Sequence, residues 1–278
     1  MIFCRQVPGP PLDGFVEHLW YFEGLEASHG MENVVPDGAF ELIIDLRDEP
    51  RKLFERENIS RHRSFRRGWM SGAHSRYIVI DVLPGASMIG AHFKAGGVAS
   101  FLGLPSDELA DRVVELEEIW GSEAAWWREQ LLEARGGKAK LRLLERLLAR
   151  RLQRGKTSRF NESRVNQAVR RLEQNGVPPA IGALADELGV SHKHLIDEFR
   201  RTVGLSPKIF SRIRRFQGVL GRIHEQKQVE WADVACVCGY YDQAHFVHDF
   251  KEFAGLNPTE FLTHTLDDPR FIPHEAAG

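Results

Sequence analysis

The stretch Gly239-Tyr-Tyr-Asp-Gln-Ala-His-Phe-Val-His-Asp-Phe250, followed by Gly255-Leu-Asn-Pro258, predicts a tight turn, a capped helix and a stop. Gly239 can adopt the positive φ of a sharp turn between helices, and the carboxylate of Asp242 can accept hydrogen bonds from the N–H groups at a helix start. Phe246 and Phe250 are four residues apart, so they anchor one helical face. The opposite face then presents polar tips, which is the form of a helix that enters a DNA groove.

An earlier stretch repeats this pattern. It runs Leu184-Ala185…Gly189-Val-Ser191…Leu195…Phe199…Gly204-Leu-Ser-Pro207, and it aligns with the later one at an offset of 50 residues at the alanines and 51 at the prolines. Two copies of one helix-turn-helix pattern are far less expected by chance than a single copy. We therefore predict two helix-turn-helix units, joined by a helix that begins near Pro207 and continues to about Ile223.

These paired motifs resemble the DNA-binding domain of the AraC/XylS family of bacterial transcription regulators, over roughly residues 160–264. Two stretches carry the resemblance. They are Gly-Tyr-x-Asp-Gln-x-His-Phe-x-x-x-Phe…Gly-x-x-Pro from Gly239 and Ser206-Pro-Lys-Ile-Phe…Arg214-Arg-Phe-Gln217. The front half resembles an N-terminal domain of some members, through Val35-Pro-Asp-Gly38 and Phe101-Leu-Gly-Leu-Pro…Leu116-Glu-Glu-Ile-Trp120. The resemblance implies a cytoplasmic regulator that binds double-stranded DNA, more often an activator than a repressor, with RNA polymerase as a partner.

Candidate DNA contacts are the side chains that point away from the phenylalanine anchors. We predict base contacts from Lys193, Ile196, Asp197, Gln243, Ala244 and His248, and phosphate contacts from Ser191, Arg200, Arg201, Arg212 and Lys251. Lysine can donate to guanine, glutamine can pair with adenine, and alanine can touch a thymine methyl group. The alternatives are that the charges are solvated surface and that Gln243 braces the turn.

Asp197 departs from the family pattern, which more often has a neutral or basic residue there, and an acid beside phosphates weakens binding. Two recognition helices on one connector are expected to enter successive major grooves about 10–10.5 bp apart.

Composition sets the frame. The 278 residues are 42% hydrophobic and 27% charged, which is ordinary for a globular protein of two domains. We find no apolar run of the roughly 18 residues that span a bilayer and no signal-peptide pattern, so we expect no membrane partner. Three cysteines fit a reducing compartment. Residues 156–264 hold 15 Lys/Arg against 13 Asp/Glu, a net +2 that is a mild footprint for nucleic acid.

The predicted fold class is α+β. A mostly-β N-terminal domain, a small barrel or sandwich with helices, spans residues 1–154, with strands in 1–97 and helices in 98–154. A linker follows at 155–162, an all-α domain with the two helix-turn-helix motifs at 163–264, and a polar, poorly ordered tail at 265–278. Residues 47–67 are rich in charge and poor in periodicity, so we expect an irregular loop there.

The N-terminal domain has aromatic and polar side chains suited to a ligand pocket. Trp20, Phe22, Trp69, His74 and His92, with Tyr21 and Phe93, supply apolar walls and polar tips for a small-molecule effector. The alternative is that they form ordinary core. The pocket hypothesis fails if these side chains pack together with no cavity between them.

Residues 123–153 predict two helices, broken at Gly136-Gly137. In the second, Leu141, Leu144, Leu148 and Leu152 recur every three or four residues and form an apolar stripe. This stripe either packs onto the N-terminal domain or forms a homodimer contact.

No motif predicts a catalytic, metal or cofactor site. The Cys236-Val-Cys238 spacing is shorter than that of zinc ligand pairs, so these cysteines are read as small buried hydrophobes. The runner-up functions are an enzyme or a protein-docking domain in the front half, fused to a DNA-binding module.

Overall fold

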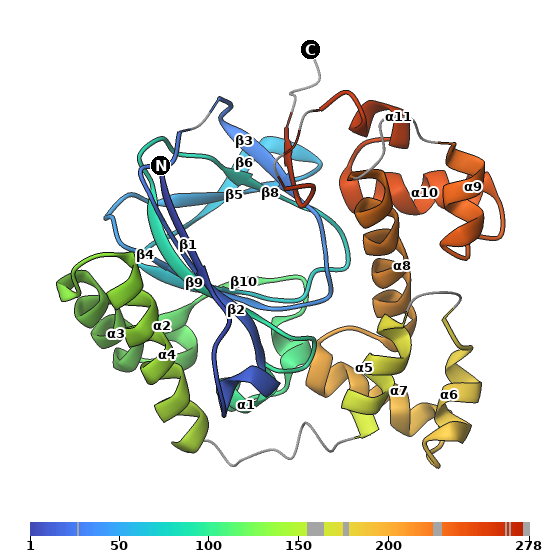
Figure 1. Cartoon of the computed structure of the whole chain (residues 1–278), viewed down its shortest axis with the longest axis horizontal. Helices are drawn as coiled ribbons and strands as arrows, with labels where there is room; N and C mark the ends of the chain where they lie inside the picture. Colours follow the sequence, from blue (N-terminus) through green and yellow to red (C-terminus); the bar gives the residue numbers. More distant parts are fainter. Residues whose placement is uncertain are drawn as a thin grey trace.

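A computed structural model describes residues 1–26, 28–154, 164–174, 178–224, 230–264, 266 and 268–274. Within these residues the N-terminal part forms two antiparallel sheets that lie face to face, with helices on the outer side of one (Figure 1). The predicted mostly-β domain with a helical C-terminal domain is thereby confirmed. The predicted linker, 155–162, lies outside the described residues.

The first sheet, sheet A, is built from hairpins and crossovers that keep every neighbour antiparallel. Its spatial order is β1 (Ile2–Gln6), β2 (Val16–Glu23), β9 (Ser87–Phe93), β4 (Glu41–Asp45), β7 (Gly68–Ser71) and β10 (Val113–Glu115). Sheet B has the order β11 (Phe271–Pro273), β3 (Met31–Val34), β8 (Ile78–Asp81), β5 (Arg51–Glu55) and β6 (Asn58–Phe65).

Side chains alternate between the two faces of sheet A, because successive residues of a strand point to opposite sides. Leu19, Leu42 and Ile89 belong to the main core cluster, which also contains the leucines of the covering helices. Trp69 and Met88 belong to a separate cluster with Phe65 of sheet B. One face of sheet A is therefore covered by helices and the other by sheet B.

The helices of the N-terminal domain are η1 (Leu12–Gly14), α1 (Ala99–Leu102), η2 (Ser106–Leu109), α2 (Leu116–Trp120), α3 (Ser122–Glu133) and α4 (Gly137–Arg154). The predicted leucine stripe lies on α4, and Leu144 and Leu148 are fully buried against the chain's own sheet. The stripe therefore packs onto the N-terminal domain, whereas a homodimer through the rest of 123–153, where Trp126 and Leu132 are exposed, stays a prediction.

Two predictions about strands were also wrong. The charged segment 47–67 forms the hairpin β5–β6, in which Leu53 and Phe65 pack inward while Lys52, Arg61 and Arg63 face solvent. High charge on the solvent face concealed the alternation. The strand β10 interrupts the segment predicted as helical, and it pairs with β7 at the edge of sheet A.

The C-terminal helices are α5 (Arg164–Glu173), α6 (Ile181–Glu187), α7 (His192–Val203), α8 (Pro207–His224), α9 (Trp231–Val237), α10 (Gln243–Ala254) and α11 (Pro258–Phe261). Helices α6 and α7 form the first helix-turn-helix unit, and α9 and α10 the second. They lie at opposite ends of the connector α8 (Figure 1), whose 18 residues span about 27 Å.

The predicted caps and anchors of both units are confirmed. The Ser191 side chain accepts from the backbone N–H of His194, and the Asp242 side chain accepts from that of His245. Gly239 has φ +77°, as the turn requires. The Phe246 and Phe250 side chains are fully buried.

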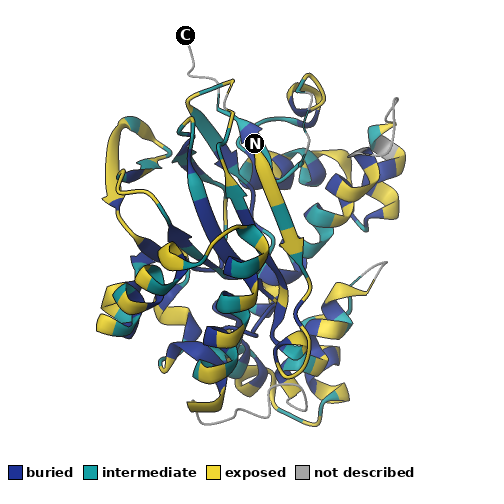
Figure 2. Ribbon diagram, turned by 60° about the vertical axis from the view of Figure 1, so that its left-hand side comes forward, coloured by how far each residue is buried: buried dark blue, intermediate teal, exposed yellow. Residues whose placement is uncertain are grey.

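The two halves of the chain share one core. Leu205, Phe216 and Phe250 belong to the same buried cluster as Phe40 and Leu42 of the N-terminal domain. Figure 2 shows buried residues running through the sheets into the inner faces of the helices, with exposed residues on the outer faces. The helix-turn-helix units are therefore docked on the sandwich rather than tethered beside it.

The prediction of a poorly ordered tail was wrong for residues 268–274, which we call the C-terminal segment. Its strand β11 pairs with β3, and the Ile272 side chain is fully buried in the main core. The His274 backbone N–H also donates to the carbonyl of Met31 (2.9 Å). A short apolar run, Phe271-Ile-Pro273, is enough to occupy a sheet edge that would otherwise leave its N–H and C=O groups unpaired.

Ile272→Ala is expected to lower the free energy of unfolding by about 2–5 kcal/mol, because it leaves a cavity in the core. Chemical denaturation of the full chain measures this. The matched control is Leu262→Ala, whose side chain is 43% exposed and which should change stability by about 0.5 kcal/mol at most. Equal effects of the two substitutions would show that the segment does not dock.

Candidate nucleic-acid interface and acidic pocket

Most predicted DNA contacts are exposed on the two recognition helices. Exposed side chains include Ser191, Lys193, Asp197, Arg200 and Arg201 on or beside α7, and Gln243, Ala244, His248 and Lys251 on α10. Ile196 is half-buried. No ion pair between described residues engages Lys193, Arg200, Arg201 or Lys251, so their charges are available to an anionic partner. The base and phosphate roles themselves stay predictions.

Arg212 is engaged in ion pairs within the protein, which argues against its predicted phosphate contact. Its Nη2 donates to Oδ1 of Asp249 (2.6 Å) and to Glu252 of α10. The Asp249 carboxylate is 1% exposed, whereas Arg212 is 19% exposed. Burial lowers the pKa of Arg212, and the two carboxylates outweigh this and raise it above its usual range. The guanidinium therefore clamps the connector to the second unit.

The second unit is also tied to the N-terminal domain. Glu252 forms an ion pair with Arg76 (3.2 Å), which lies in the loop between β7 and β8. Asn33 of β3 donates from Nδ2 to the carbonyl of Ala254 at the end of α10 (3.0 Å). His248, a predicted base contact, is 3.8 Å from Glu252. One carboxylate thus lies between the DNA-facing helix and the sandwich.

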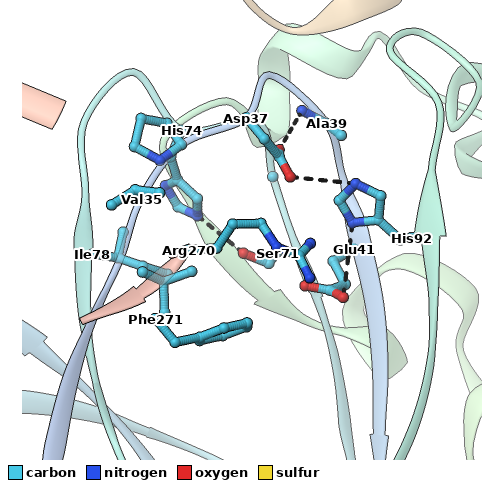
Figure 3. Close-up of a pocket in the computed structure, with 13 residues that line it drawn as sticks. Val35, Asp37, Ala39, Glu41, Ser71, His74, Ile78, His92, Arg270 and Phe271 are labelled. Carbon is cyan, nitrogen blue, oxygen red and sulfur yellow. Dashed lines mark hydrogen bonds and ion pairs between the residues drawn. The ribbon is translucent and has the colours of Figure 1, made fainter. Parts of the chain in front are cut away.

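A small cavity with both polar and apolar walls lies between the two sheets, at the junction with the C-terminal segment. It has a volume of about 50 Å³, and its polar lining, here called the acidic pocket, consists of Asp37, Glu41, Ser71, His74, His92 and Arg270. Glu41, Ser71 and His92 come from strands of sheet A, while Arg270 comes from the C-terminal segment (Figure 3). The pocket therefore includes groups from both ends of the chain.

His92 is the charged centre of this pocket. Its Nε2 lies 3.3 Å from Oδ2 of Asp37 and 3.7 Å from Glu17, and its Nδ1 lies 3.8 Å from Glu41. Burial lowers the pKa of His92, but the surrounding carboxylates outweigh it and raise this pKa to about 9.

The other histidines of this region are kept neutral. His18 stacks on His92 at 5.1 Å between ring centroids, and burial, together with the His92 charge, lowers its pKa to about 4. Burial also lowers the pKa of His74 to about 4, and its Nε2 shares a 3.0 Å hydrogen bond with the Ser71 hydroxyl.

The predicted ligand-binding set is divided between this pocket and the core. His74 and His92 line the cavity, whereas Trp69 lies in the apolar cluster between the sheets and Trp20 and Phe22 pack against that cluster. The Trp20 and Phe22 rings stack at 5.6 Å. The aromatic walls were therefore wrongly assigned: these side chains fill the sandwich interior. Trp20 reaches the pocket only by donating from Nε1 to Glu41 (2.8 Å).

Sequence reasoning missed Asp37, Glu41, Ser71 and Arg270. A signal for two of them was present, since Glu41 is two residues before the inward Ile43 and Ser71 two after the inward Trp69, which places all four on one face. Asp37 lies in the quoted Val35-Pro-Asp-Gly38 motif without a role. Arg270 lies within residues 265–278, which were predicted to be a poorly ordered tail without a role.

Comparison with known families assigns the two parts separately. Residues 184–264 match a family described as a helix-turn-helix domain, and residues 5–115 match a domain of unknown function, DUF6597. The chain therefore carries a C-terminal helix-turn-helix domain. The matched residues include the turns, caps and phenylalanine anchors of both α7 and α10. The match ends before the C-terminal segment. No curated protein matches the chain.

Solved structures with some likeness include ToxT from Vibrio cholerae, bound to an unsaturated fatty acid. It has 10% identity and a TM-score of 0.47, and the match covers 94% of each chain. A probable AraC family regulator from Rhodopseudomonas palustris has 26% identity and a TM-score of 0.31, with 35% of this chain and 95% of that one covered. An AraC-type regulator from Chromobacterium violaceum has 20% identity and a TM-score of 0.33, over 35% and 87%. With TM-scores this low, the likenesses assign no ligand.

The described part of the chain also bears on metal binding, cysteine burial and membrane spans. Its residues contain no cluster of three or more histidine, cysteine, aspartate or glutamate side chains that would hold a metal ion. Cys238 is buried as predicted, but Cys236 is exposed, so the prediction that both are buried is half wrong. None of the helices in the described ranges is long and apolar enough to cross a bilayer.

Arg212→Ala is expected to destabilise the full chain by about 3–5 kcal/mol, because it leaves the buried Asp249 without its partner. Urea unfolding measures the change. The control Arg201→Ala removes an exposed arginine and should alter stability by about 0.5 kcal/mol at most. An Arg212→Ala variant with normal stability and weakened DNA binding would restore Arg212 to the phosphate contacts.

The raised pKa of His92 predicts that the free energy of unfolding falls at alkaline pH. Because its folded pKa, about 9, is above the unfolded value of 6.5, its contribution is complete below pH 6.5 and disappears as pH rises through 9. The full loss is about 3 kcal/mol. Urea unfolding between pH 6.5 and 9.5 should show this slope in the wild type and not in His92→Gln. His74→Gln should keep it, since the lowered pKa of His74 acts only as pH falls below 6.5.

Proposed function

We propose that this protein is a cytoplasmic transcription regulator that reads double-stranded DNA through α7 and α10 and receives a signal through its N-terminal domain. The observation that carries this is the pair of capped, phenylalanine-anchored helices within a matched helix-turn-helix domain. Binding to a promoter and contact with RNA polymerase, with activation as the outcome, complete the proposal.

The geometry of the C-terminal domain supports DNA reading. Lys193 lies in the first turn of α7 and His248 near the middle of α10, where base edges would be met, and Arg200, Arg201 and Lys251 follow toward the helix ends. The connector is about 27 Å long, which is compatible with two recognition helices one DNA turn apart, about 34 Å. Asp197 remains the unfavourable member, because its carboxylate is exposed on the same face.

A signalling role for the N-terminal domain is supported by the contacts of the pocket wall. The carbonyls of Pro36 and Asp37 accept from Gln217 (2.7 Å) and Arg214 (3.5 Å) of the connector. Arg76, two residues after His74, pairs with Glu252 of α10. A change at the acidic pocket would therefore be felt by both the connector and the second unit, which is what a switch between two docked arrangements requires.

The proposal predicts different defects for two substitutions. Arg201→Ala should weaken binding to specific and random DNA alike and reduce the salt slope by about one unit, because a phosphate contact is lost. Lys193→Ala should cost about 1–3 kcal/mol on the preferred site and leave random DNA nearly unaffected. Titrations of the full chain on a site selected from random DNA, at several salt concentrations, measure both.

Footprinting on the same site shows whether two neighbouring grooves are protected on one face. If the protein binds selected and random DNA equally, DNA reading is excluded. An enzymatic or protein-docking role of the N-terminal domain would then be the better hypothesis.

A further inference from the structure

The acidic pocket has more negative charge than its own domain can balance. His92 is within 3.8 Å of three carboxylates, those of Glu17, Asp37 and Glu41. His74 is neutral at physiological pH, and Arg5 of β1 is directed to His18 instead, with 3.1 Å between Nη2 and Nδ1. Buried charge without a partner is costly. Glu17 is 54% exposed, but Asp37 and Glu41 are only 22% and 27% exposed, so these two carboxylates favour a further cation beside them.

Arg270 of the C-terminal segment places a guanidinium in the lining of the pocket, with Asp268 of the same segment as its ion-pair partner. The carboxylates of Asp268, Glu41 and Asp37 raise its pKa despite its burial. Asp268 accepts from Nε (3.1 Å) and Nη2 (2.7 Å) and so orients the guanidinium, which lies beside the Glu41 carboxylate in Figure 3. Backbone contacts hold it there: β11 pairs with β3, and the carbonyl of Arg270 accepts from the N–H of Val35 (3.0 Å).

Two further features indicate that this position is a ligand site. The Nδ1 atom of His92, a residue of the cavity lining, is buried 3.8 Å from Glu41 and has no hydrogen-bond partner among the described residues. The cavity of about 50 Å³ holds only a few water molecules. Removing the Arg270 side chain would enlarge it by roughly the volume of a guanidinium group and its stem, which is room for a small ligand.

We propose that the acidic pocket is a binding site for a small guanidinium or primary ammonium ligand, and that Arg270 occupies it as an internal substitute. A ligand of this class replaces the Arg270 guanidinium beside Glu41 and Asp37 and releases the C-terminal segment from β3. Since this segment follows the second helix-turn-helix unit directly, its release loosens the docking of that unit. The inference rests on the proposed signalling function and adds the chemical class of the signal.

Methylguanidinium chloride is the probe, tested on the full chain against NaCl at equal ionic strength. Internal occupancy lowers apparent affinity by the fraction of open sites. Arg270→Ala should therefore bind methylguanidinium about tenfold or more tightly than the wild type, and adding Glu41→Gln should reverse the gain. Arg146→Ala, which removes an exposed arginine of α4 outside the pocket lining, is the matched control and should behave as the wild type.

Hydrogen exchange reports the segment itself. In the wild type the His274 amide, which donates to Met31, should exchange slowly, and in Arg270→Ala it should exchange faster. If the Arg270→Ala chain does not fold, Arg270→Met keeps the apolar stem and takes the same tests. Equal methylguanidinium binding by the wild type and the Arg270 variant, or binding that survives Glu41→Gln, overturns the proposal.

DNA titration of the same variants separates the two levels of inference. If selected DNA is still read but methylguanidinium has no effect on Arg270→Ala, the cation site is wrong and the regulator stands. If no variant reads DNA, the proposed function is wrong, and the methylguanidinium isotherm still decides the cation site.

Discussion

The turn Val35-Pro-Asp-Gly38 is the constraint on which the arrangement of the whole chain depends. The Asp37 carboxylate contacts His92 inside the sandwich, while the carbonyls of Pro36 and Asp37 accept from the connector α8. Gly38 has φ +85°, and a Cβ there would lie 2.7 Å from the Phe210 ring. Only glycine allows both this backbone and this approach. Four consecutive residues thus determine both the ion pair of His92 in the pocket and the position of α8 against the sandwich.

The interior of the sandwich has an apolar end and a polar end, and the boundary between them falls part-way along each strand. On one face of sheet A, Ile43, Trp69 and Met88 make or border an apolar cluster, and two residues further along the strands Glu41 and Ser71 begin the polar end. A strand cannot change face without a bulge, so polar and apolar inward residues can only be separated by position along it. The polar end lies beside the C-terminal domain, where it can act on the connector.

The sequence predicted local structure well where the signal was repeated and failed where long-range contacts decide. The caps Ser191 and Asp242 and the anchors Phe199 and Phe250 follow from short spacings, so the helical domain could be derived. Arg212 looked like a surface charge, because its partner Asp249 is 37 residues away and the pairing depends on helix packing. The order of the C-terminal segment was equally hidden, since its partner strand is more than 230 residues earlier in the chain.

The interface between the helix-turn-helix units and the sandwich is polar near the acidic pocket and apolar elsewhere. Phe40 and Phe216 share a core that does not respond to small changes in charge. The Arg76–Glu252 and Arg270 contacts, by contrast, depend on neighbouring carboxylates and are weakened when those are neutralised or paired with another cation. A signal that acts through charge would therefore loosen the second unit first, because both contacts lie there. The first unit would remain packed beside Phe40. The orientation of α10 relative to α7 could then change.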